Sequence, residues 1–130
     1  MKYLIVYMSH HGTTQNIATH MAEHLGKENT SLINLKSDDI QDPEAYETII
    51  IGGSIHAGHV QKEVMDFCEE NQSLLLTKRV GLFLCGMATK EKEKEFSKAF
   101  PDWLTLHATT KGYFGGELLL DKMNFLEKVV

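Results

Sequence analysis

Residues 3–25 read YLIVYMSHHGTTQNIATHMAEHL and carry the clearest signal of the fold class. Its opening run, Tyr3 to Met8, is continuously apolar and of strand length, which is typical of a central strand covered on both faces. A helix is predicted over residues 14–25, because apolar residues recur there at three- and four-residue spacing before Gly26 ends the pattern. A strand that leads through a short loop into a helix is the repeating unit of a parallel α/β sheet.

The same alternation continues outward to the end of the chain. The segment 31–35 contains the polar Asn34, which suits an edge strand, and Asp42 with Pro43 predicts the start of a helical turn. Further strands are predicted over 48–51, which ends in Gly52-Gly53, over 80–84 and within 109–116. Helices are predicted around 60–68 and over 90–103, where the charged run 90–95 is the solvated side and the buried side is Phe96, Ala99, Phe100 and Trp103. This order predicts one doubly wound α/β domain over residues 1–130, with helices on both faces of a parallel sheet. Only residues 121–130 remain for a last, shortened helix.

Composition excludes some classes of function. The formal net charge is −5 and the sequence pI about 5.8, so we expect no nucleic-acid partner. No apolar run approaches the ~20 residues that span a bilayer, and the apolar run near the N-terminus is too short for a signal peptide. We therefore expect a cytoplasmic protein without an integral membrane segment. Cys68 and Cys85 lie among apolar neighbours, which favours buried, reduced thiols over a disulfide.

The loop after the first strand has the composition of a phosphate site. In doubly wound sheets, ligands bind outside the carboxyl ends of the strands. This loop offers hydroxyl groups, a glycine and the N-terminus of a helix, all of which suit an anion. No Lys follows Gly12, so the P-loop pattern is absent, as is the dinucleotide pattern GxGxxG. The predicted phosphate residues are Ser9, His10, His11, Gly12, Thr13 and Thr14.

Two further loops are rich in small residues. The segment from Gly52 to His59 holds three glycines and two histidines, which suits a loop whose backbone lies against a flat ligand. The segment from Cys85 to Thr89 follows the next strand and is small and flexible in the same way.

The sequences of these three loops resemble those of a known protein family. YMSHHGTTQNIA resembles the phosphate loop of flavodoxins, [ST]xTGxT, with its first hydroxyl at Ser9 and with His11 where many members have Thr. IIIGGSIHAGHV, LFLCGMATK and KGYFGGEL resemble the flavodoxin-domain branch that includes menaquinone-dependent protoporphyrinogen dehydrogenase. The resemblance runs over essentially the whole chain. It implies a flavodoxin-like five-stranded parallel sheet of order 2-1-3-4-5.

The resemblance also implies FMN as the cofactor. The phosphate would lie in the first loop, and the isoalloxazine ring would be framed by the other two. The residues expected at the ring are Ser54, Ile55, His56, Ala57, Gly58, His59, Gly86, Met87, Ala88 and Thr89. Because the flavin carries the redox chemistry, no catalytic side chain is assigned.

Several alternatives stay open at this point. Seven histidines raise the question of a metal site, but the loops that hold His10, His11, His56 and His59 contain no carboxylate, so no metal is assigned. Cys85 at a strand end is a formal candidate for a nucleophile, without an identifiable base.

The partner is expected to be a redox protein or a quinone- or porphyrinogen-like molecule. Because the last helix is short, a second copy of the chain is an option for covering the sheet edge. The chain is therefore expected to be an FMN oxidoreductase, a pure electron-carrier flavodoxin, or a flavodoxin-like module that has lost FMN.

Overall fold

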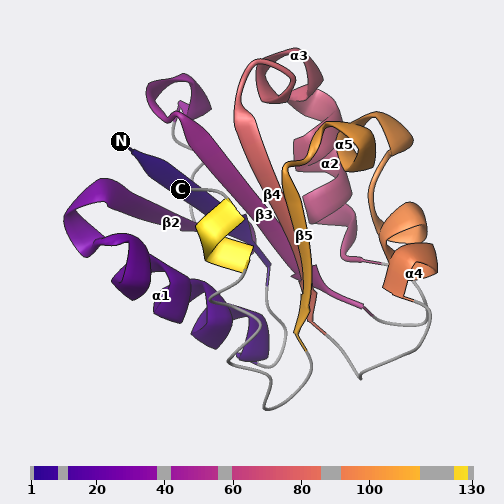
Figure 1. The fold of residues 1–130 in the computed structure, drawn as a ribbon. Helices are drawn as coiled ribbons and strands as arrows, with labels where there is room; N and C mark the ends of the chain where they lie inside the picture. The colour runs from indigo at the N-terminus through magenta and orange to yellow at the C-terminus, as the bar shows by residue number, and fades with distance from the viewer. Residues whose placement is uncertain are drawn as a thin grey trace.

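Five parallel strands form a sheet of order β2-β1-β3-β4-β5 in the computed structural model, which describes residues 2–8, 12–37, 42–55, 60–85, 92–114 and 125–128 (Figure 1). The strands are β1 (Tyr3–Tyr7), β2 (Thr30–Asn34), β3 (Thr48–Ser54), β4 (Arg79–Cys85) and β5 (Thr110–Phe114). The helices are α1 (Thr13–Leu25), α2 (Lys62–Glu70), α3 (Gln72–Leu75), α4 (Lys92–Ala99) and α5 (Asp102–His107), with 3-10 turns η1 (Lys27–Asn29) and η2 (Pro43–Ala45) and a further helical turn at 125–128. The predicted doubly wound sheet of order 2-1-3-4-5 is confirmed.

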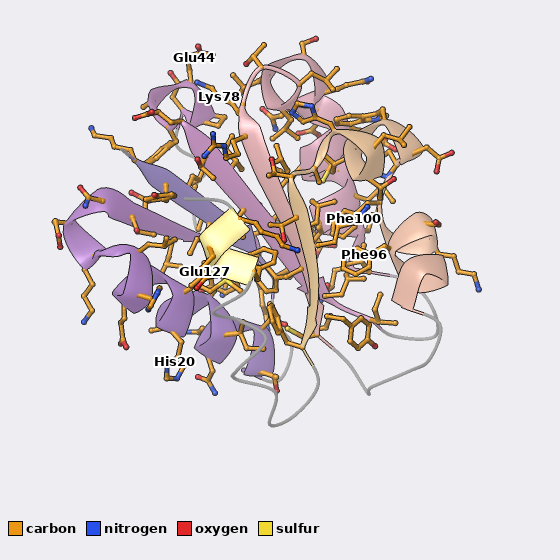
Figure 2. The ribbon with its side chains drawn as sticks, viewed as in Figure 1. His20, Glu44, Lys78, Phe96, Phe100 and Glu127 are labelled. Atoms are coloured by element: carbon orange, nitrogen blue, oxygen red, sulfur yellow. The ribbon has the colours of Figure 1, made fainter. Side chains whose placement is uncertain are left out.

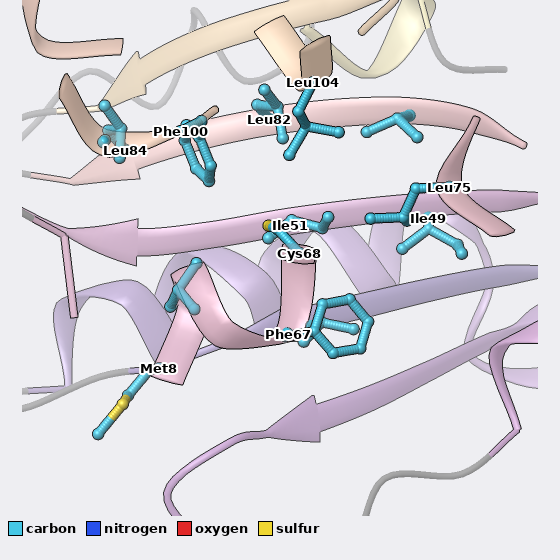
Figure 3. Packing of buried hydrophobic residues seen from close by; sticks show 14 of the residues in the cluster. Met8, Ile49, Ile51, Phe67, Cys68, Leu75, Leu82, Leu84, Phe100 and Leu104 are labelled. Carbon is cyan, nitrogen blue, oxygen red and sulfur yellow. The ribbon is translucent and has the colours of Figure 1, made fainter. Parts of the chain in front are cut away.

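Alternate residues of the central strands supply two separate hydrophobic cores. On β1, Leu4 and Val6 face the core that is closed by α2, α3, α4 and α5. Ile5 and Tyr7 face the other core, which is closed by α1 and the turn at 125–128. Figure 1 shows these helices on the two sides of the sheet, and Figure 3 shows Cys68 of α2 beside Ile51 of β3 in the first core. Because both faces are covered, β1 is buried along its whole length, as its apolar run predicts.

Two local predictions are also confirmed: the edge strand at β2, and the helical turn that begins at Asp42 and Pro43. β2 lies at the edge of the sheet and pairs only with β1 among the described strands. Ile33 is its only buried residue, whereas Leu32 is 36% exposed. The backbone N–H of Glu44 donates to Oδ1 of Asp42 over 3.0 Å, so Asp42 caps η2 with Pro43 at its first position.

The prediction that β3 ends before Gly52-Gly53 was wrong, because both glycines lie inside the strand. An ideal Cβ on Gly52 would lie 2.0 Å from Cζ of Phe83, its partner on β4. A Cβ on Gly53 would lie 2.5 Å from Cγ2 of Val60 on the other face. The glycines therefore make room for side chains that pack on the strand, and they do not form a loop.

The single helix predicted over 90–103 is two helices, α4 and α5. Pro101 precedes α5 with extended backbone (φ −61°, ψ 149°), and a residue before proline disfavours the helical conformation. The predicted buried side is nevertheless confirmed, since Phe96, Ala99 and Phe100 are buried and Trp103 packs at the margin of the same core. The rings of Phe96 and Phe100 stack with centroids 6.2 Å apart (Figure 2).

The helical turn described at 125–128 is anchored by aromatic packing. Phe125 is 3% exposed, and its ring centroid lies 5.8 Å from Phe114 and 6.3 Å from Phe83, edge-on to both. Leu126 is buried beside it. In Figure 1 this turn, in yellow, shares the face of the sheet with α1.

Candidate functional site

The carboxyl ends of β1, β3 and β4 meet the beginning of α1 at one edge of the sheet. Here two hydroxyl groups from distant parts of the chain lie together: Oγ1 of Thr14 and Oγ of Ser54 are 2.7 Å apart and share a hydrogen bond. Thr14 is fully buried and Ser54 is half-buried. The sequence placed these residues in separate loops, one for a phosphate and one for a ring, and the structure brings them into direct contact.

The N-terminus of α1 opens onto the same edge. Gly12 is its N-cap residue, with φ of 86° in the left-handed region and no heavy atom within 4 Å of the position of a Cβ. Among the described residues, no side chain caps this helix, and its first turn holds no acidic residue. The N–H groups at the start of a helix have no partner within the helix and carry partial positive charge. This terminus can therefore receive an anion.

Gln61, which the sequence analysis did not single out, is a third polar group at this edge. It is 8% exposed, and its side-chain amide joins two strands: Oε1 accepts from the backbone N–H of Ser54 over 3.0 Å, and Nε2 donates to the carbonyl of Met8 over 3.4 Å. The sequence held one signal for this role. Gln61 stands at the N-cap position of α2, where Ser, Thr, Asp and Asn are the preferred capping residues, so its side chain is free to serve another purpose.

Cys85 lies beside Thr14 at the same edge, and its thiol is buried. Burial raises the pKa of its thiol to about 11, and a side-chain hydrogen bond with Thr14 offsets part of that rise. Burial, with a smaller contribution from the Glu69 carboxylate, raises the pKa of Cys68 to about 12. Both thiols are buried and free, as predicted, and both keep their protons at neutral pH.

The raised thiol pKa values predict a loss of stability in alkali. Because the folded chain holds these protons more tightly than the ordinary pKa of 9.0 allows, the stabilisation is complete below pH 9 and is lost as the pH rises towards 11 to 12. Each thiol adds at most about 1.4 kcal/mol per pH unit to the slope. Urea unfolding between pH 8 and 10.5, under reductant, should show a steeper decline for the wild type than for Cys68→Ala/Cys85→Ala. Equal slopes would contradict the pKa values.

The predicted site residues divide into two groups. Gly12, Thr13, Thr14, Ser54 and Ile55 lie at the carboxyl edge, with Ser54 as the last residue of β3 and not in a loop; Thr13 is exposed, and the N–H of Ile55 donates to the carbonyl of Cys85 over 3.0 Å. The others lie outside the described residues: Ser9, His10, His11, His56, Ala57, Gly58, His59, Gly86, Met87, Ala88 and Thr89.

Other candidates lie away from this edge. His20 and His24 are exposed on α1, and Nε2 of His107 lies 2.7 Å from the carbonyl of Lys78 at the opposite end of the sheet. Nζ of Lys78 also donates to the carbonyl of Glu44 over 3.0 Å (Figure 2). Within the described ranges, no three His, Cys, Asp or Glu side chains could hold a metal ion, and no helix is long and apolar enough to cross a membrane.

A model of the flavodoxin domain family matches residues 4–130. The chain belongs to this family. Its curated relatives include the quinone-linked protoporphyrinogen IX dehydrogenases of Leishmania major, 21% identical over 99% of this chain and 60% of the relative, and of Escherichia coli K12, 25% identical over 72% and 53%. The chain therefore spans between half and two thirds of the length of these relatives.

Solved flavodoxins share the fold of this family member over almost its whole length. A short-chain flavodoxin associated with a non-canonical PDU bacterial microcompartment has a TM-score of 0.73 at 18% identity, covering 99% of this chain and 97% of its own. The flavodoxin of Fusobacterium nucleatum bound to flavin mononucleotide has a TM-score of 0.59 at 17% identity, covering 99% and 95%. At these identities the likeness establishes the fold.

Proposed function

We propose that this chain binds FMN and transfers electrons with it, as a flavodoxin-type oxidoreductase related to the protoporphyrinogen and quinone dehydrogenases. The observation that carries the proposal is the Thr14–Ser54 hydroxyl pair, 2.7 Å between oxygens, beside the N-terminus of α1, which no described side chain caps. The proposal is supported by the family membership and by the flavodoxin that was solved with flavin mononucleotide bound.

The described residues fit the phosphate end of FMN. A phosphate monoester needs several donors, and this edge offers two hydroxyls and the first-turn N–H groups of a 13-residue helix. Thr14 and Ser54 would both hold the phosphate, so Ser54 has a different role from the ring contact expected from the sequence. Ile55 would begin the segment that frames the ring. Bound FMN supplies the electron-accepting chemistry, and the chain supplies binding, orientation and exclusion of water.

The choice of substrate rests on the curated relatives. Both are named as quinone-linked dehydrogenases of protoporphyrinogen IX, so a quinone or a porphyrinogen is the proposed small-molecule partner. Pure electron transfer to a redox protein is the second candidate function. It is supported by the short-chain flavodoxin, whose fold this chain shares with a TM-score of 0.73.

Two measurements test these functions in turn. Purified protein should show flavin absorbance bands, or should take up added FMN with quenching of the flavin fluorescence. A colourless preparation that fails to take up FMN would identify a module that has lost the cofactor. FMN-loaded protein should then convert protoporphyrinogen to fluorescent porphyrin in the presence of a menaquinone analogue. Normal FMN binding without porphyrin fluorescence would favour the electron carrier.

A further inference from the structure

We infer that Gln61 is a positioning residue whose amide is inserted between β1 and β3 and holds their carboxyl ends apart for the phosphate of the cofactor. This inference rests on the proposed function for the identity of the ligand. The position of the amide is independent of it, because it follows from the hydrogen bonds between the two strands.

The pairing of β1 with β3 shows where the amide is inserted. The N–H of Thr48 donates to the carbonyl of Lys2, and the N–H of Met8 donates to the carbonyl of Gly52 over 3.4 Å. In a parallel ladder of this register, the next bond would run from the N–H of Ser54 to the carbonyl of Met8.

Instead, the Gln61 amide stands between these two groups. Its Oε1 accepts from Ser54 and its Nε2 donates to Met8, and only this orientation of the amide satisfies both backbone groups. One backbone hydrogen bond between the strands is thus replaced by two hydrogen bonds through a side chain. The strands are therefore separated at the last position of their pairing, between Met8 and Ser54.

The local sequence is suited to this insertion. Gln61 occupies the N-cap position of α2, yet its side chain makes no capping bond and turns to the sheet. Gly53 leaves the necessary room, since a Cβ there would lie 2.8 Å from Oε1 of Gln61. Burying a primary amide is costly unless its groups are paired, and here both the oxygen and the nitrogen have backbone partners.

The place of the insertion links it to binding. The strand order turns between β1 and β3, since β1 leads outward to β2 and β3 leads outward to β4. Ligands of doubly wound sheets bind in the crevice at this point. β1 ends at Tyr7, just before Met8, and α1 begins at Thr13; Ser54, at the end of β3, carries the hydroxyl that meets Thr14. By separating Met8 from Ser54, Gln61 sets the spacing of the two hydroxyl-bearing segments.

The first experiment tests the insertion without any flavin. In uniformly labelled wild-type protein, scalar coupling through the hydrogen bond should correlate the Ser54 amide nitrogen with the side-chain carbonyl carbon of Gln61. In Gln61→Ala the same nitrogen should correlate with the backbone carbonyl carbon of Met8, because the open rung can then close. A wild-type correlation from Ser54 to Met8 would overturn the inference, whether or not FMN binds.

The second experiment measures affinity for FMN and for riboflavin, which lacks the phosphate. Gln61→Ala should raise the Kd of FMN about tenfold, the range expected when a hydrogen bond to a charged group is misplaced, and should change the Kd of riboflavin less than about twofold. Gln72→Ala, at an exposed glutamine of α3, is the matched control and should change neither.

The outcomes separate positioning from simple stability. Equal weakening of FMN and riboflavin, together with a lower melting temperature, would indicate a merely structural role and overturn the inference. An FMN affinity equal to that of the wild type would overturn it as well. If the wild type binds neither flavin while the Ser54–Gln61 correlation is present, the proposed function and the phosphate ligand fail, and the inserted amide stands.

Discussion

Gly52→Ala is expected to destabilise the protein by about 3 kcal/mol, at the upper end of the usual cost of overpacking a core. The new methyl group would lie 2.0 Å from Cζ of Phe83, so the ring must move. Phe83 is fully buried, and its ring packs against Phe114 and Phe125 at centroid distances of 6.1 and 6.3 Å. For a chain of this size the melting temperature should fall by roughly 10–15 °C in calorimetry.

A double variant identifies the cause of this loss. Phe83→Leu removes the edge of the ring that would meet the methyl group. The loss of unfolding free energy in Gly52→Ala/Phe83→Leu should therefore be clearly smaller than the sum of the losses in the two single variants. If the glycine instead serves only its backbone conformation, the two effects will add. That additive result would contradict the claim that glycine is required at position 52 because the Phe83 ring fills the space of a side chain.

Thr14→Val should weaken FMN binding by roughly 10- to 100-fold, the equivalent of one hydrogen bond to a charged group. Valine has nearly the same shape as threonine but replaces the hydroxyl by a methyl group. The change therefore removes the bonds of Thr14 to Ser54 and to Cys85 while it keeps the volume of a fully buried residue. The Kd of FMN is measured by quenching of flavin fluorescence, in parallel with the Kd of riboflavin.

The matched control is Thr19→Val, further along the same helix and away from the carboxyl edge. It should leave the Kd of FMN within about twofold of the wild type, since it removes no donor from the phosphate end. Unchanged FMN affinity in Thr14→Val, with an intact fold, would place the phosphate away from the Thr14–Ser54 pair. An equal loss of affinity in both variants would point to a general effect on α1.

Features that depend on neighbours in the sequence were predictable. The apolar run from Tyr3 to Met8 predicted a strand covered on both faces, and Asn34 predicted an edge strand, because burial on two faces or one leaves a direct mark on composition. Asp42 and Pro43 predicted η2 because a cap acts within a few residues. Gly12, Thr13 and Thr14 were placed at the start of a helix for the same reason.

Features that depend on distant residues were not. Gly52-Gly53 has the composition of a loop, and only distant side chains show why glycine is required inside β3: the Phe83 ring at Gly52, and Val60 with Gln61 at Gly53. The contact of Thr14 with Ser54 joins residues 40 positions apart, and the role of Gln61 depends on Met8, 53 positions away. The break at Pro101, by contrast, was present in the sequence, but the apolar spacing around it hid the end of the helix.

The strand order also has a consequence for how the chain acquires its structure during synthesis. β1 is made first but lies inside the sheet, and its second neighbour, β3, is complete only at Ser54. Every pairing in the sheet is parallel, so none can form as a local hairpin. The edge of β1 that pairs with β3 therefore has no partner strand until some 50 further residues have left the ribosome. Its exposure to aggregation during that interval is set by the speed of translation and by the early packing of α1 against it.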